Sequence, residues 1–375
     1  MGEILSNPSS EEDVLFRLRD GRTMAARVIG PEYGVPILTL HGSPGSRLGP
    51  HVGRTALIEL GVRLIAPDRP GYGLSDPNEG RTIADTARDI GEVMDQLEVE
   101  RFEVVGRSGG TPYALAVAAL HGARISGVVS FASLAPKEAP IDWTGGMTDD
   151  NKRKHEAAII SYEEILADVR RHAAEMENDP NHMIDTLWPD LKTSDKAALI
   201  AELPEEHIRR DIILAQKEGF RQGGVGWGED TRALHADWGI DLQDVKPLVT
   251  LWHGAHDPFA APMHSTWLSE HLPNASLVID PDGSHMTSYL HNYSALEQLR
   301  DMHVGADAAR ELRDQVAATR EQIYKDMGTS QDAFTGGEVG TFSDAEQYAN
   351  WRAAKLLAEA SQAAVVRNFL TGIDQ

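Results

Sequence analysis

Short apolar runs that end in turn residues recur along the chain. Each spans only a few residues and is rich in Val, Leu, Ile or Phe, a pattern that favours strands buried on both faces of a sheet. Turn residues follow each run, which also fits short strands. We therefore expect buried parallel strands at Val35 to Leu40, Arg63 to Ala66, Phe102 to Val105, Gly127 to Phe131, Leu248 to Trp252 and Leu277 to Ile279.

Helical segments lie between these runs, and the clearest extends from Thr82 to Leu97. Its apolar residues recur on one helical face, and Thr82 followed by Asp85 forms an N-terminal capping pattern. Parallel strands joined by crossover helices build a doubly wound, mostly parallel α/β sheet. Such a sheet binds ligands at the carboxyl ends of its strands, so chemically active residues should follow strands directly.

Two regions depart from this alternation of strand and helix. Residues 139–241 are helical and polar in pattern, and we interpret them as a helical cap inserted into a core formed by residues 1–138 and 242–301. Residues 302–375 continue as a C-terminal helical extension, whose second helix opens with Ser343 and Glu346 in a capping arrangement. Scattered aromatic or apolar residues mark both regions: Trp143, Trp188, Trp227 and Trp238 in the cap, and Tyr348, Trp351, Ala354, Ala358, Val365 and Phe369 in the extension.

Composition narrows the range of partners. The 375 residues contain 41% hydrophobic and 25% charged residues, which is ordinary for a folded globular protein. A formal net charge of −23 repels nucleic acid and anionic membrane surfaces, so neither is expected as a partner. The N-terminal residues lack the features of an export signal and no apolar run approaches membrane-spanning length, so we expect a cytoplasmic location.

The absence of cysteine limits the chemistry further. With no cysteine in the chain there is no disulfide, no thiolate nucleophile and no cysteine-ligated metal. A catalytic nucleophile would therefore have to be oxygen or nitrogen.

The sharpest chemical signal is Gly106-Arg107-Ser108-Gly109-Gly110, a G-x-S-x-G pattern between a predicted strand and a helix of small residues. In a nucleophile elbow the serine occupies a strained turn, and flanking glycines avoid collisions with neighbouring backbone. The dipole of the following helix and the Gly109 amide would stabilise a developing oxyanion. The pattern also occurs by chance in glycine-rich turns. Whether Ser108 is catalytic therefore depends on whether the chain also supplies a base and an acid to orient it.

A serine hydroxyl needs a base, and the base needs a third group that fixes its tautomer. Downstream of Ser108, Asp257 lies in His253-Gly254-Ala255-His256-Asp257-Pro258 after one predicted strand. His285 ends Asp282-Gly283-Ser284-His285 after the next. The order along the chain is serine, acid, histidine.

These three motifs resemble the nucleophile, acid and histidine motifs of α/β-hydrolases. HGSPGS at 41–46 and DRPGYGLSD at 68–76 also resemble loops of that family, and the resemblance spans about residues 13 to 300. It implies the α/β-hydrolase fold, a catalytic triad of Ser108, Asp257 and His285, and an oxyanion hole formed by the amides of Ser43 and Gly109. It implies no cofactor and no metal. Haloalkane dehalogenases and epoxide hydrolases carry aspartate at the elbow, which position 108 does not.

Several residues admit a second interpretation. Asp68 and Asp282 are alternative acids, although Asp68 precedes the nucleophile and residues of its kind more often pin their own turn. His41, His253 and His256 could contribute to a metal site but occupy positions that are usually architectural. Arg107 could touch substrate or pack beneath the elbow, and the cap tryptophans could line an acyl pocket or belong to the core.

The sequence therefore predicts a serine hydrolase that cleaves an ester, lactone or related acyl bond of a small molecule through an acyl-enzyme. The same triad also serves C–C bond hydrolysis, aminopeptidase, perhydrolase and biosynthetic cyclisation chemistry, and the fold alone does not separate them. A non-catalytic ligand-binding protein would be expected to show a broken triad. The C-terminal extension is a candidate homodimerisation element.

Overall fold

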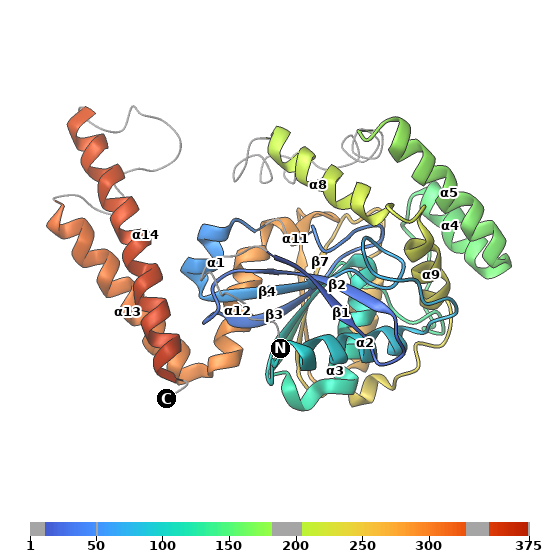
Figure 1. The fold of residues 1–375 in the computed structure, drawn as a ribbon, viewed down its shortest axis with the longest axis horizontal. Coiled ribbons are helices and arrows are strands. Elements are labelled where there is room, and N and C mark those ends of the chain that lie inside the picture. Colours follow the sequence, from blue (N-terminus) through green and yellow to red (C-terminus); the bar gives the residue numbers. More distant parts are fainter. Residues whose placement is uncertain (1–11, 50–51, 182–204, 328–344, 374–375) are drawn as a thin grey trace.

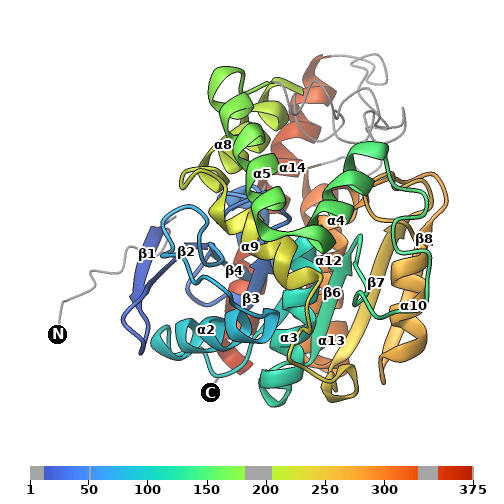
Figure 2. The ribbon, with the colours of Figure 1, turned by 90° about the vertical axis from the view of Figure 1, so that its right-hand side faces the viewer.

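A computed structural model describes residues 12–49, 52–181, 205–327 and 345–373. One eight-stranded sheet runs through it in the order β1-β2-β4-β3-β5-β6-β7-β8 (Figure 2). The last six strands are parallel, and each matches a predicted apolar run with ends that shift by at most two residues. They are β3 (Val35–Leu40), β4 (Val62–Pro67), β5 (Glu103–Arg107), β6 (Gly127–Phe131), β7 (Leu248–Gly254) and β8 (Ala275–Asp280).

An antiparallel hairpin at the edge of the sheet was not among the predicted strands. It consists of β1 (Glu12–Arg17) and β2 (Thr23–Ile29), and β2 pairs antiparallel with β4. The hairpin turns through Asp20 and Gly21, and Gly21 has a φ of 93°. An Asp-Gly pair between alternating apolar and polar residues is a hairpin signal, so the sequence did contain the information.

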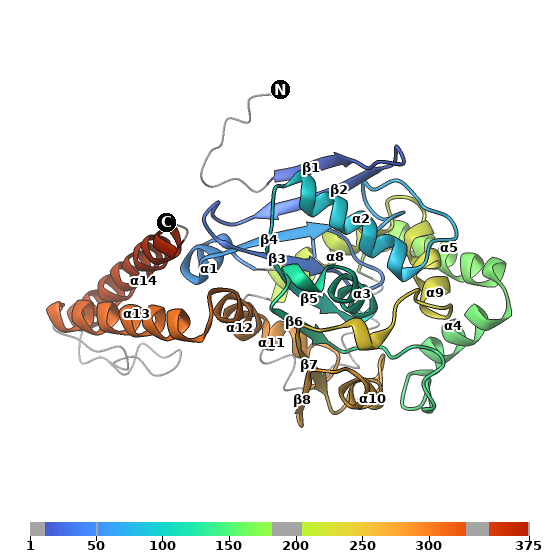
Figure 3. The ribbon, with the colours of Figure 1, turned by 90° about the horizontal axis from the view of Figure 1, so that it is seen from below.

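Helices cover both faces of the sheet, as the α/β prediction requires (Figure 3). One face carries α2 (Ile83–Gln96), α3 (Thr111–His121) and α10 (Met263–His271), packed in a continuous apolar cluster. The opposite face carries α1 (Arg54–Leu60) and α12 (Asn292–Val304) over a second cluster. The predicted cap of α2 is present, since Thr82 Oγ1 accepts from the Asp85 amide and the Asp85 carboxylate accepts from the Thr82 amide.

Four described α-helices lie between β6 and β7, and we refer to them as the cap helices. They are α4 (Asp149–Ile160), α5 (Tyr162–Asn178), α8 (Glu205–Gly219) and α9 (Val225–Leu234). They lie beyond the carboxyl ends of the parallel strands (Figure 1). Trp143 and Trp238 are buried in the core cluster, whereas Trp227 packs among the cap helices; Trp188 lies outside the described residues.

The C-terminal extension forms two long helices, α13 (Ala306–Asp326) and α14 (Ala345–Ile373), which pack against each other and project to one side of the sheet (Figure 1). Val366 and Leu370 of α14 are buried against Gly61 at the end of α1. Ser343 and the side chains of Tyr348 and Trp351 fall outside the described set. No described helix is long and apolar enough to cross a membrane.

Candidate active site

Ser108 occupies a strained turn between a buried strand and a helix. Strand β5 ends at Arg107, a single 3-10 turn covers Ser108–Gly110, and α3 begins at Thr111. Ser108 has a φ of 49°, in the left-handed region that non-glycine residues rarely adopt. Such a conformation costs about 1–3 kcal/mol and persists only where the surroundings enforce it.

The flanking glycines show what enforces this turn. A Cβ at Gly106 would lie 2.8 Å from the Ala114 Cβ and 3.0 Å from the Thr111 Cα. A Cβ at Gly110 would collide with the backbone carbonyl oxygens of Leu40 and His41. The helix and the neighbouring loop therefore press against the turn from both sides, and only glycine fits at these two positions.

Asp257 and His285 are brought together by the ends of neighbouring strands. Asp257 follows β7, and His285 lies between β8 and the short helix α11 (Thr287–Leu290). The His285 Nδ1 is 2.8 Å from the Asp257 Oδ2. The two loops approach closely, because a Cβ at Gly254 would overlap the Ser284 carbonyl oxygen.

The Asp257 carboxylate is buried and held in a fixed orientation. Its Oδ1 accepts hydrogen bonds from the backbone amides of Phe259 at 2.8 Å and Ala260 at 3.0 Å. Burial raises the pKa of Asp257, but His285 and His253 outweigh that effect and hold the pKa below its ordinary value. The group is therefore ionised at neutral pH, and Nδ1 of His285 is the nitrogen that donates to it.

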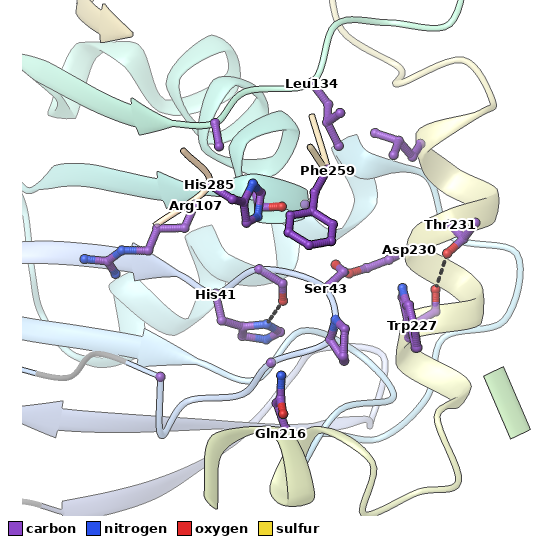
Figure 4. A pocket seen from close by; sticks show the side chains of 18 of the residues that line it. His41, Ser43, Arg107, Leu134, Gln216, Trp227, Asp230, Thr231, Phe259 and His285 are labelled. Atoms are coloured by element: carbon purple, nitrogen blue, oxygen red, sulfur yellow. Dashed lines mark hydrogen bonds between the residues drawn. The ribbon is translucent and has the colours of Figure 1, made fainter. Parts of the chain in front are cut away.

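Ser108 and His285 line one cavity of about 330 Å³, large enough for a small molecule. Phe259 stands edge-on to the His285 ring, with ring centres 5.2 Å apart. Figure 4 shows both beside the cavity, with Trp227 on α9 at the far side and Gln216 on α8 at the base. Core loops and cap helices therefore enclose the cavity together.

The two predicted oxyanion donors lie next to each other at the elbow. A Cβ at Gly109 would be 3.3 Å from the Ser43 backbone nitrogen, and a Cβ at Gly42 would be 3.5 Å from the Ser108 Cβ. Ser43 and Gly109 both line the cavity. The loop after β3 therefore passes close to the elbow.

Asp230 is a cavity residue that the sequence analysis missed. It lies on α9 of the cap, is 4% exposed, and reaches toward Ser43 (Figure 4). Five described side chains donate hydrogen bonds to its carboxylate: Ser43, Arg69, Tyr72, Arg81 and Tyr113. One aspartate in a polar helix gives no local signal, and its partners lie more than a hundred residues earlier.

The alternative acids and histidines have other contacts. Asp68 accepts from the Arg47 amide at 2.6 Å and the Leu74 amide at 3.0 Å, so it pins its own turn. Asp282 is exposed. His253 is buried, with its Nδ1 2.6 Å from the Ser265 Oγ and its Nε2 2.8 Å from the Ala260 carbonyl oxygen. Among the described residues, no group of three or more histidine, aspartate or glutamate side chains is arranged to hold a metal.

Arg107 lines the cavity, and its guanidinium is directed away from Phe259 and Trp227 (Figure 4). It donates to the Asn292 Oδ1 at the start of α12 and lies over the Phe131 ring, 6.0 Å from the ring centre. Burial lowers the pKa of Arg107 below its ordinary value. These contacts favour packing beneath the elbow.

A mostly parallel sheet with a serine elbow after one strand, and an acid–histidine pair after the last two, is the arrangement of the α/β-hydrolase class. Comparison with known proteins agrees. A model of the family described as "alpha/beta hydrolase fold" matches residues 35–157. The chain has the α/β-hydrolase fold, and over the matched residues it resembles that family.

Individual relatives are similar over most of their length. The chain is 26% identical to the uncharacterized hydrolase YcgS of Bacillus subtilis over 71% of this chain and 89% of that protein. It is 26% identical to a proline iminopeptidase of Neisseria meningitidis, over 66% of this chain and 82% of the relative. A thermophilic esterase from Thermogutta terrifontis shares the fold with a TM-score of 0.53 and 18% identity, over 77% of this chain and 97% of that structure.

Proposed function

We propose that this hydrolase is a serine hydrolase that cleaves an ester or related acyl bond of a small molecule. In the proposed mechanism Ser108 Oγ attacks the acyl carbon while His285 Nε2 takes its proton. The amides of Ser43 and Gly109 bind the tetrahedral oxyanion. The leaving group departs with a proton from His285, and water then releases the acyl group from Ser108 by the same steps.

The observation that carries this proposal is the convergence of three sequence-distant residues at one cavity. Ser108, held at a φ of 49°, and His285 line the same cavity, and the Asp257 Oδ2 lies 2.8 Å from the His285 Nδ1. Since the ionised Asp257 accepts from Nδ1, the Nε2 of the neutral imidazole is the basic nitrogen. That is the tautomer that a general base for a serine requires.

The cavity disfavours an aminoacyl substrate. A proline iminopeptidase is among the relatives, and a substrate with a free N-terminal amine would call for an unpaired carboxylate in the cavity. The two acidic side chains among the described lining residues are Asp230 and Asp168. Asp230 is bound by two guanidinium groups, and Asp168 is 2.5 Å from a nitrogen of Arg171.

The cap helices and the extension have separate proposed roles. We assign recognition of the acyl group to the cap helices, because Trp227 and Ile165 bring apolar surface to the cavity that Ser108 also lines. The triad calls for no cofactor. We keep homodimerisation through α13 and α14 as a proposal, tested by comparing the solution mass of the full chain and of a chain that ends before residue 302.

A substrate panel tests the proposed function. Wild-type protein and Ser108→Ala would be assayed with p-nitrophenyl acetate, p-nitrophenyl butyrate, a lactone, a thioester and proline p-nitroanilide. We expect Ser108-dependent turnover of the esters, with kcat falling by about 10³-fold or more in Ser108→Ala. Ester turnover that Ser108→Ala retains would refute the nucleophile, and turnover of the anilide alone would refute the ester assignment.

A further inference from the structure

Behind the Ser43 amide lies a buried charged cluster, Arg69, Arg81 and Asp230, that the triad does not use. Both arginine side chains are fully buried and the Asp230 side chain is 4% exposed. Burial raises the pKa of Asp230, but Arg69 and Arg81 outweigh it and hold the pKa well below its ordinary value. With two guanidinium groups and one carboxylate, the cluster carries a net charge of +1 beside the cavity.

Arg69 connects this cluster to the backbone of the oxyanion loop. Its Nη1 donates to the carbonyl oxygen of His41. Its Nη2 lies 3.3 Å from the carbonyl oxygen of Gly42 and 2.9 Å from the Ser43 Oγ. The Ser43 Oγ in turn donates to the Asp230 Oδ2 at 2.6 Å. Arg69 therefore contacts the backbone of the oxyanion loop, and Arg69 and Asp230 together hold the Ser43 side chain.

The Gly42 carbonyl belongs to the same peptide group as the Ser43 N–H. Because a trans peptide is planar, its C=O and N–H point in opposite directions, so fixing the oxygen fixes the direction of the N–H. Arg69 holds the oxygen, and the amide nitrogen lies on the side of Gly109. A cation on the carbonyl oxygen also polarises the peptide and strengthens the N–H as a donor.

His41 supports the same carbonyl from a second direction. Burial lowers the pKa of His41 well below its ordinary value, so the ring is neutral. The Arg69 backbone amide lies 3.4 Å from Nε2, which makes Nε2 the acceptor. Nδ1 then carries the proton and donates to the Gly42 carbonyl oxygen at 2.8 Å.

We propose that Arg69, anchored by Asp230 from the cap, is a positioning residue that orients and polarises the Ser43 amide of the oxyanion hole. The inference rests on the proposed function, since it assigns a role within the same site. It also couples the cap to catalysis, because Asp230 holds Arg69 only while α9 is seated on the core. Binding of the ground-state substrate does not depend on it, whereas stabilisation of the oxyanion does.

The chain offers a matched control in Arg81. This residue is equally buried and also donates to Asp230, to its Oδ1. Its other side-chain hydrogen bonds within the described part of the chain go to Thr86 and Tyr113, not to the oxyanion loop. Arg69→Met and Arg81→Met therefore remove the same charge from the same cluster. Only the first removes the contact with the Gly42 carbonyl.

The test uses an aryl trifluoromethyl ketone, which has no leaving group. The Ser108 Oγ forms a bond to the carbonyl carbon as the C=O π bond breaks, and the Oγ proton passes through His285 to the former carbonyl oxygen. The product is a hemiketal whose hydroxyl is titrated by ¹⁹F NMR. We expect Arg69→Met to raise the pKa of that hydroxyl by about one unit, the equivalent of a tenfold weaker hold on the oxyanion. It should lower kcat on p-nitrophenyl acetate by about tenfold or more with KM little changed. Arg81→Met should shift the hemiketal pKa by less than half as much.

Equal shifts in the two variants, or an unchanged hemiketal pKa in Arg69→Met, would overturn the inference while leaving the triad intact. Should Arg69→Met fail to fold, Arg69→Lys and Ser43→Ala test the same inference. Each should raise the hemiketal pKa by less than Arg69→Met, since each weakens only part of the contacts between Asp230, Arg69 and the oxyanion loop. If wild-type protein forms no adduct that Ser108→Ala lacks, the proposed function fails and this inference fails with it.

Discussion

Replacing Asp257 by asparagine isolates the role of one oxygen atom. The Asp257 Oδ1 accepts from the amides of Phe259 and Ala260, so the oxygen of an asparagine must occupy that position. Its NH₂ group then replaces Oδ2 and faces the His285 Nδ1 as a second donor. The imidazole responds by moving its proton to Nε2, which removes the base that Ser108 needs.

The expected loss of kcat is therefore close to the whole contribution that the correct His285 tautomer makes to catalysis. By the measured behaviour of such a substitution in serine proteases, kcat falls about 10⁴-fold, equivalent to about 5 kcal/mol of barrier. The assay is kcat on p-nitrophenyl acetate at pH 7, with thermal unfolding as a check on the fold. Asp282→Asn, at the exposed alternative acid, is the matched control and should keep wild-type kcat. An Asp257→Asn protein that retains a tenth of the wild-type kcat would refute this reasoning.

Three further predictions concern stability and specificity. Burial raises the pKa of Asp13, but hydrogen bonds from Arg47 and Arg27 outweigh it and lower the pKa from 3.8 to about 2. The stability that the ionised Asp13 contributes is therefore complete above pH 3.8 and is lost as the pH falls toward 2. Urea titrations at pH 5 and pH 3 should accordingly show a smaller loss of unfolding free energy on acidification in Asp13→Asn than in wild type. Leu370→Ala should lower the free energy of unfolding by about 2–4 kcal/mol, whereas Leu357→Ala, at a 49% exposed position of the same helix, should change it by under about 0.5 kcal/mol; equal effects would contradict the docking of α14. Trp227→Ala should shift the preference between p-nitrophenyl acetate and butyrate toward the longer acyl chain, and an unchanged ratio of kcat/KM would remove this residue from the acyl pocket.

The fold was predictable because strands buried on both faces appear in the sequence as short, continuous apolar runs. Each of the six runs from Val35 to Ile279 became a strand, and the α/β class followed from the helices between them. The edge hairpin was missed since its residues alternate in polarity and form no continuous apolar run. The Asp20-Gly21 turn was the available signal.

The candidate site was predictable to the extent that its residues follow strands. Asp257 and His285 were predicted together because neighbouring parallel strands end at one edge of a sheet, and the structure places them within hydrogen-bonding distance. Asp230 could not be predicted in the same way. Its role depends on how a cap helix is seated over Arg69 and Arg81, and no spacing in the sequence encodes that contact.

The most direct test of the central claim is the mass of the protein after reaction with a fluorophosphonate. We predict a single added phosphonyl group, which peptide sequencing locates on Ser108, and no adduct on Ser108→Ala under the same conditions. An adduct on another residue, or a wild-type protein that stays unmodified while folded, would contradict the assignment of Ser108 as the nucleophile.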